Sequence, residues 1–285
     1  MKSLQVQIRR EFWEHRALWI APLSVAAALL AVVALFGHQQ LVHLDTTDGV
    51  TAAGGRAPPV FEIMIIGWAM IFYVTAAIMA SVYLMDCLYG ERRDRSILFW
   101  KSLPVSNTQT VLVKFLVGLV IVPLGSFLLA AVTSALASGI LEVRHRAALN
   151  GDLSLWNTIT WLRLQGVMLY AVVVTLLWYA PYAAYLMLAS AWARRSPYMW
   201  ALIPPILLVL FEHMVFGTNY VSRILLRSYG ELSKLAFRTY GGSGPLANIP
   251  DPAGLLASPQ FWLGLAAAAL MLALAIRLRR YRDDS

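Results

Sequence analysis

Charged residues are scarce in this chain. Asp, Glu, Lys and Arg make up 13% of its 285 residues, whereas soluble domains contain about 25%. Hydrophobic residues make up 59%, and they fall in runs of about 20, the length that crosses a hydrocarbon core of about 30 Å. This composition excludes an ordinary soluble globular protein and predicts an all-α integral membrane protein.

The chain also has almost no cysteine and no recognisable nucleotide-binding motif. Cys87 is the single cysteine, so an internal disulfide and a cysteine-based zinc site are excluded. No segment matches G-x-x-x-x-G-K-[ST], because the Gly241–Gly244 run lacks the lysine, and no G-x-S-x-G motif marks a nucleophile. We therefore expect a non-enzymatic chain with no ATPase domain, catalytic residue, metal site or cofactor of its own.

The hydrophobic runs predict one transmembrane domain over residues 1–285. Six runs meet the length criterion of about 20 residues, at 17–36, 61–85, 111–139, 164–191, 198–217 and 259–276. Pro123, Pro181 and the pair Pro204–Pro205 are expected to kink or interrupt their helices. His38, His43, Asp45 and Asp48 then fall in the first external loop, whose Thr, Gly and Pro content argues against a fixed metal site.

The distribution of positive charge predicts the orientation. The net charge is +8, and 14 of the 23 Lys and Arg residues lie in four short segments, 1–16, 86–110, 192–197 and 277–285. Because Lys and Arg collect on the cytoplasmic side, both termini are expected there, in a bacterial-type inner membrane. The basic residues thus indicate topology and contact with anionic lipid, and we expect no nucleic-acid partner.

Two further segments are expected to be helices that do not span the membrane. Leu4, Ile8 and Phe12 recur every four residues beside charged neighbours, which predicts an amphipathic helix on the inner surface. Residues 221–238 show a second apolar stripe with an Arg227–Glu231 pair at i,i+4 spacing. This second helix is expected outside, as an interfacial or re-entrant segment between the fifth and sixth spans.

The connection after the second span, residues 86–106, carries most functional information. A charged group of residues is followed by an apolar cluster that includes Ile97, Phe99 and Trp100, and Pro104 ends it. A short amphipathic helix with an aromatic anchor fits a groove on another protein. Contact with lipid headgroups is the alternative that composition leaves open.

Residues 90–106, GERRDRSILFWKSLPVS, resemble the cytoplasmic loop of ABC type-2 transporter permeases, which carry a similar E-R-x-x-x-S-[IT]-x-x-x-x-S-L-P-V-S stretch. The resemblance covers the whole chain in layout and about 20 residues in motif. It implies a coupling helix between the second and third spans that sits in a cleft of a cytoplasmic ABC ATPase dimer. That partner would bind ATP and Mg²⁺, and a second permease copy or a sister permease would complete the membrane assembly.

The resemblance also implies roles for individual residues. Glu91 and Arg95 would pair with charges on the ATPase, while Phe99 and Trp100 would anchor in its cleft. The full set of expected coupling residues is Glu91, Arg92, Asp94, Arg95, Ile97, Phe99 and Trp100. The implied function is an exporter permease for an amphiphilic cargo such as a peptide, a drug or a lipid-like molecule.

Four residues inside the spans are candidates for the substrate pathway. Glu212 and His213 are adjacent ionisable residues within a span, where such groups are costly and often functional. Trp68 and Trp178 lie deeper than the other tryptophans and could line a cavity. Two alternatives stay open: a proton-coupled secondary transporter that uses Glu212 and His213, and a membrane anchor or sensor that transports nothing. Snorkelling or ion pairing of Glu212 is the structural alternative.

Overall fold

The computed structural model describes residues 2–47, 59–94, 106–149, 157–193, 195–220, 229–239 and 248–281. These residues form helices and one two-stranded sheet. In chain order the elements are α1 (Lys2–Glu14), α2 (Ala17–Thr47), α3 (Pro59–Asp86), α4 (Tyr89–Arg93), α6 (Asn107–Leu116), the π-helical η1 (Val117–Ile121), α7 (Val122–Leu149), α8 (Thr158–Trp192), α9 (Pro197–Phe216), α11 (Tyr229–Ala236), β1 (Phe237–Thr239), β2 (Asn248–Pro250), α12 (Pro252–Leu256) and α13 (Pro259–Tyr281).

Six helical stretches among the described residues are long and apolar enough to cross a membrane. They coincide with the six predicted spans, which confirms the all-α, multi-pass prediction at this level. The first span differs at its end, because α2 continues to Thr47 and takes in residues expected in a loop. No Gly or Pro follows Gly37 until Gly49, so no residue in that stretch disfavours continued helix.

Large apolar side chains on α9 are exposed. Met214 is 84% exposed, Phe216 68% and Leu207 58%. A soluble monomer rarely exposes a contiguous apolar face of this kind. Contact with hydrocarbon explains it, which agrees with a membrane-spanning helix.

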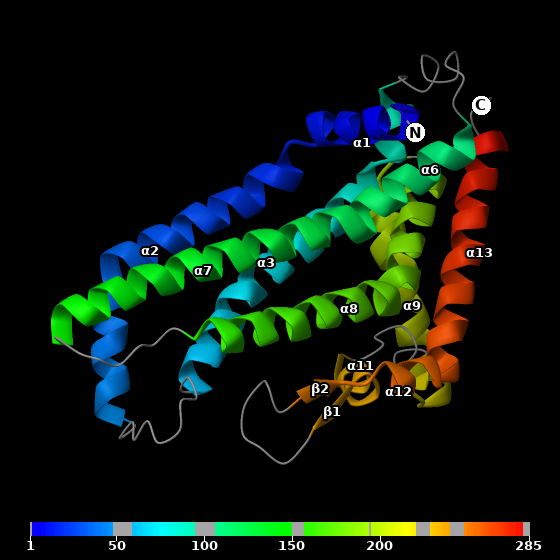
Figure 1. Cartoon of the computed structure of the whole chain (residues 1–285). Helices are drawn as coiled ribbons and strands as arrows, with labels where there is room; N and C mark the ends of the chain where they lie inside the picture. The colour runs from blue at the N-terminus through cyan, green and yellow to red at the C-terminus, as the bar shows by residue number, and fades with distance from the viewer. Residues whose placement is uncertain are drawn as a thin grey trace.

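Helix α8 contributes side chains to all four buried apolar clusters among the described residues. Along its second half α8 packs against α13, where Ala180, Ala184 and Ala268 form a buried contact and small side chains let the helices approach closely. Its first half packs with α2, α3 and α7, around Phe72. Figure 1 shows α1, α6 and the end of α13 together at one end of the molecule, near both termini, with α11, the sheet and α12 away from it.

The prolines act differently from one another. The π-helical segment η1 ends at Ile121, two residues before Pro123, so the expected local disruption is present there. By contrast, α8 continues through Pro181 and α9 through Pro204 and Pro205 without interruption. A Cβ atom added to Gly118 in η1 would lie 2.7 Å from Leu84 Cδ2, so glycine is what allows η1 to approach α3.

The segment between the fifth and sixth spans is only partly the predicted helix. Helix α11 ends at Ala236, and Phe237 begins a strand whose residues pair antiparallel with Asn248–Pro250. The prediction of helix to residue 238 was therefore wrong at its end. Phe and Thr favour the extended conformation, and Arg238 Nε donates to Asp251 Oδ2 at 2.5 Å. Residues 221–228 lie outside the described residues.

Candidate functional site

Buried charges from four helices meet at the end of the molecule that holds α1, α6 and the end of α13 (Figure 1). We call this set the buried ion network; its members are Arg10 and Glu11 of α1, Glu91 of α4, Lys114 of α6 and Arg279 of α13. These helices come from distant parts of the sequence. The network therefore fastens the N-terminal helix, the segment after the second span, and the third and last spans together.

Lys114 occupies the centre of the network. Its side chain is 1% exposed, and Nζ lies 2.8 Å from Glu11 Oε1 and 3.2 Å from Glu91 Oε1. The Tyr83 hydroxyl donates to Glu11 Oε2 at 2.8 Å, which satisfies a further acceptor. A buried ammonium is tolerated because it is paired and hydrogen-bonded; a lone one would carry a large desolvation cost.

Glu91 connects the network to α13 and α1. Its carboxylate forms ion pairs with Arg279 Nη2 at 2.9 Å and with Arg10 Nη2 at 3.3 Å. Because Glu91 is only 7% exposed, this carboxylate is turned into its own chain. Within the chain, the charge of Glu91 holds the base of the 90–106 segment in place, and its pairing with charges on a partner protein stays a prediction. Arg10 also pairs with Glu14 at 2.6 Å, so the positive and negative charges balance.

Helix α4, which contains Glu91, is also fixed to the end of α8. The amides of Leu88 and Tyr89 donate to Ser190 Oγ at 3.1 and 3.0 Å. Arg92 Nη2 donates to the carbonyls of Ser190 and Ala193 at 2.5 and 3.1 Å. The carbonyls at a helix C-terminus have no intrahelical donor, and a cationic side chain there also complements the helix dipole. Arg92 therefore acts as a cap on α8.

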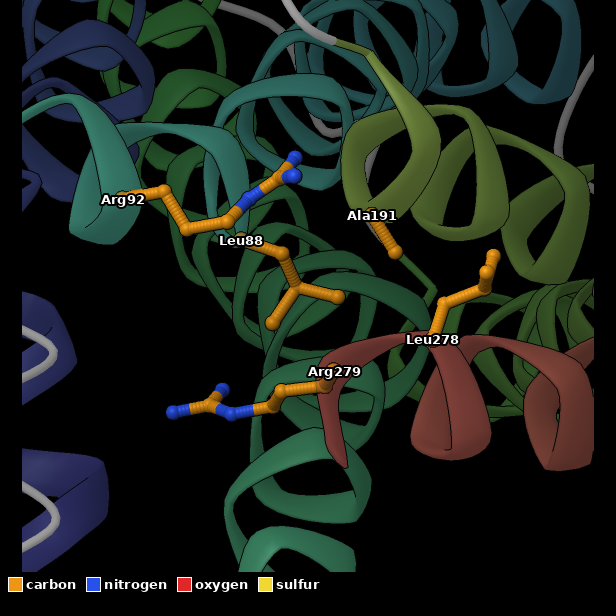
Figure 2. Close-up of a pocket in the computed structure, with 5 residues that line it drawn as sticks. All are labelled: Leu88, Arg92, Ala191, Leu278 and Arg279. Carbon is orange, nitrogen blue, oxygen red and sulfur yellow. The ribbon is translucent and has the colours of Figure 1, made fainter. Parts of the chain in front are cut away.

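Figure 2 shows how these parts meet: Leu88 lies between the Arg92 and Arg279 side chains, beside Ala191 of α8 and Leu278 of α13. The pocket among these residues has a volume of about 10 Å³, room for about one water molecule. It is too small for a nucleotide or an organic ligand. The arrangement is a joint between α4, α8 and α13.

The remaining predicted coupling residues divide into two groups. Asp94 is exposed and pairs with Arg93 at 3.1 Å. Arg95, Ile97, Phe99 and Trp100 lie outside the described residues. After the gap, Ser106 begins α6 as its N-cap, with Oγ accepting from the Gln109 amide at 3.2 Å, as serine commonly does at a helix start. The segment that carries the resemblance therefore runs between two anchored points, α4 and Ser106.

Glu212 and His213 are not brought together as a pair. Glu212 is buried, and its Oε1 accepts from Thr218 Oγ1 at 2.9 Å and from the Tyr220 amide at 2.5 Å. His213 is exposed. Gly217 ends α9 in the left-handed conformation, with φ 61°, so the chain turns back and places the Thr218 hydroxyl and the Tyr220 amide on the carboxylate. These contacts describe a structural role for Glu212 in the turn after α9.

The two deep tryptophans also lie apart from one another. Trp178 is 1% exposed and packs in a core with Leu232 and Phe261, so it is a buried core residue. Trp68 lines a cavity of about 340 Å³ between α2 and α3. Only Trp68 therefore keeps a position compatible with a pathway.

A larger cavity, which we call the α3/α8 groove, has a volume of about 990 Å³. Its walls come from α3 (residues 66–84), η1 with Pro123, α8 (residues 164–186), and Ser233, Lys234 and Phe237. This volume is at the upper end of the about 300–1,000 Å³ typical of small-molecule sites. Sequence reasoning missed it, because it depends on how far the two helices separate.

A possible metal-ligand group occurs in α1 and just after it. Glu11, Glu14 and His15 offer ligand atoms within 4.8 Å of one another. Glu11 is already bound by Lys114 and Tyr83, and Glu14 by Arg10. Burial lowers the pKa of His15, whose ring meets the edge of Tyr83 with centroids 4.9 Å apart. The carboxylates thus serve the ion network, and we do not assign a metal site to them.

One feature of the sequence could have indicated the buried ion network. Glu11 lies three residues after Ile8, on the apolar face of the N-terminal helix, and Lys114 stands between Val113 and Phe115. A charge on an apolar face must find a partner when buried. Two such charges of opposite sign, on helices predicted to start on the same side, are candidates for one buried pair.

Comparison with known proteins gave no relative: no protein-family model, no curated protein and no solved structure matches this chain.

Proposed function

We propose that this chain is the membrane subunit of an ATP-driven exporter, of the kind that the resemblance to ABC type-2 permeases implies. Residues 90–106 would be the coupling segment, contacting a separate cytoplasmic ABC ATPase dimer that binds ATP and Mg²⁺. The chain itself would supply the pathway and catalyse no reaction. Both termini would be cytoplasmic in a bacterial inner membrane, and a second copy or a sister permease would complete the assembly.

The observation that carries the proposal is the anchoring of α4. Ion pairs of Glu91 connect it to α1, α6 and α13, and Arg92 connects it to the end of α8. A segment that only rests on lipid needs no such attachment. A segment that must transmit movement from a partner to the spans needs a rigid base, because interfaces and packed cores shift as rigid bodies.

Two other functions are less well supported. A proton-coupled transporter would use Glu212 and His213, but Glu212 is engaged by Thr218 and Tyr220 at the end of α9. A non-transporting anchor or sensor would share the ATPase contact, and vesicle transport of a candidate cargo separates it from an exporter.

Co-purification tests the proposal. The chain is expressed with each ATPase encoded near its gene and isolated in lipid nanodiscs, and complex recovery and ATP turnover are measured. We compare Trp100→Ala with Trp13→Ala, since Trp13 is a 63% exposed tryptophan outside the coupling segment. Glu91 is unsuitable for this test because its loss would disturb the buried ion network.

We expect the wild-type chain and Trp13→Ala to retain the ATPase and alter its turnover, and Trp100→Ala to lose both. A wild-type chain that recovers none of the candidate ATPases would refute the exporter function. Equal losses in both variants would show that the 90–106 segment is not the specific contact.

A further inference from the structure

The α3/α8 groove is lined mainly by apolar side chains, and part of each wall carries small ones. Ala76, Ala77 and Ala80 of α3 and Ala171 and Ala183 of α8 are among its lining residues. Ala77 is exposed, so its methyl group borders open space. Residues 66–84 of α3 line the groove, which corresponds to about 27 Å at 1.5 Å per residue. The groove is thus long and apolar, the shape of a site for hydrocarbon chains.

Charge is confined to one place in this groove. Among the described residues that line it, Lys234 of α11 is the one with a formal charge, and its side chain is exposed. The other polar side chains of the lining are neutral hydroxyl groups, those of Tyr73, Ser81, Thr175, Tyr179, Tyr182 and Ser233. A lone ammonium beside an apolar surface favours an anion as its partner.

We propose that the α3/α8 groove binds an anionic amphiphile, with its hydrocarbon chains along the apolar walls and its anionic headgroup at Lys234. An anionic membrane phospholipid is the occupant that fits this combination. One part of this inference rests on the proposed function, namely that this class of molecule is the exporter's cargo. The binding itself requires no ATPase and is tested without one.

Photo-crosslinking in nanodiscs tests the binding. The full chain is reconstituted with a phosphatidylglycerol that carries a photoreactive acyl chain, and labelled peptides are mapped by mass spectrometry. A phosphatidylcholine with the same chains is the matched probe, because it differs only in its headgroup, which has no net charge. We expect the phosphatidylglycerol to label peptides of α3 and α8, with competition by unlabelled phosphatidylglycerol.

Four variants separate headgroup from chain binding. Lys234→Gln should weaken labelling about fivefold, the effect of one basic residue at an anionic lipid surface. Arg238→Gln removes the same charge four residues later, from a residue outside the groove lining, and should leave labelling unchanged. Ala77→Phe should reduce labelling to background by filling the groove, whereas Ala27→Phe, at an exposed alanine of α2, should not.

Equal labelling by both probes, or full labelling of Ala77→Phe, would overturn the proposal. Crosslinks between two copies of the chain at this groove, in place of lipid adducts, would overturn it too, because a protein would then cover the site. If lipid binds as described but no ATPase is recovered, the inference stands and the exporter function fails. If the ATPase is recovered and the lipid does not bind, only the inference fails.

Discussion

Replacing Glu91 with glutamine removes one charge from the buried ion network and almost no volume. Glutamine keeps a side-chain oxygen that can accept a hydrogen bond from Arg10. Lys114 keeps both oxygens of Glu11, at 2.8 and 3.0 Å. Arg279 is the residue most affected, because its ion pair among the described residues is the one with Glu91 at 2.9 Å.

The size of the effect follows from burial. The side chains of Arg279 and Glu91 are each 6% exposed, so water cannot replace the missing carboxylate without local opening. Removing one partner of a buried pair leaves an uncompensated charge and costs about 3–5 kcal/mol. We expect Glu91→Gln to lower the free energy of unfolding by that amount. Asp94→Asn is the matched control, since the Asp94–Arg93 pair is solvent-exposed and screened, and we expect no measurable change.

Unfolding is measured in detergent–lipid mixed micelles by titration with sodium dodecyl sulfate, followed by circular dichroism and tryptophan fluorescence. The double variant Glu91→Gln/Arg279→Met removes both charges. We expect it to be more stable than Glu91→Gln alone, because a buried pair replaced by neutral residues avoids the unpaired charge. Glu91→Gln as stable as Asp94→Asn, or a double variant less stable than the single one, would refute the reasoning.

Three further predictions follow from packing, hydrogen bonds and protonation. Gly118→Val should lower stability by about 1–3 kcal/mol, measured in the same titration, because its Cβ would lie 2.7 Å from the buried Leu84 side chain. Glu212→Gln should lower stability by about 1 kcal/mol, through weaker hydrogen bonds, and leave cargo transport in vesicles unchanged; abolished transport would favour the proton-coupled alternative. Burial lowers the pKa of His15, so the unfolded chain, with a histidine pKa of about 6.5, binds this proton more readily. Stability should therefore fall as pH drops below about 6.5, and His15→Phe should flatten the pH profile there.

The number and place of the spans could be predicted, because hydrophobic length is a local property of the sequence. Helix ends were less predictable. Residues 38–47 were expected in a loop on account of their polarity, but polar residues without Gly or Pro also continue a helix past the apolar run. The end of α11 shows the opposite case, since the pairing of Phe237 with Pro250 depends on a second strand that lies beyond a gap in the described residues.

The candidate site was harder to predict than the fold, since its charges are assembled from distant segments. The charged motif after the second span indicated that its residues form contacts, but not whether those contacts are with another protein or with the chain itself. Arg92 and Glu91 are neighbours in sequence, and both bind within the chain, to α8 and to the ion network. A single sequence contains no information about which face of a five-residue helix such as α4 meets its own protein. The packing of the whole chain decides which face of α4 is buried.

Helix α4 connects the ion network to the ends of both groove walls, which links the two proposals. Helix α3 ends at Asp86, shortly before α4, and α8 ends beside Ser190, which holds α4. In an exporter, a push on the coupling segment would thus move the ends of both groove walls. Breaking the ion network would cost about 3–5 kcal/mol for each separated pair, so joint movement of α1, α4, α6 and α13 is favoured over separation. The π-helical η1 lies between Lys114 and Pro123 and also lines the groove at Gly118. Since helices kink at π-helical turns, which are frequent at functional sites, η1 is the segment where such a movement would bend the third span.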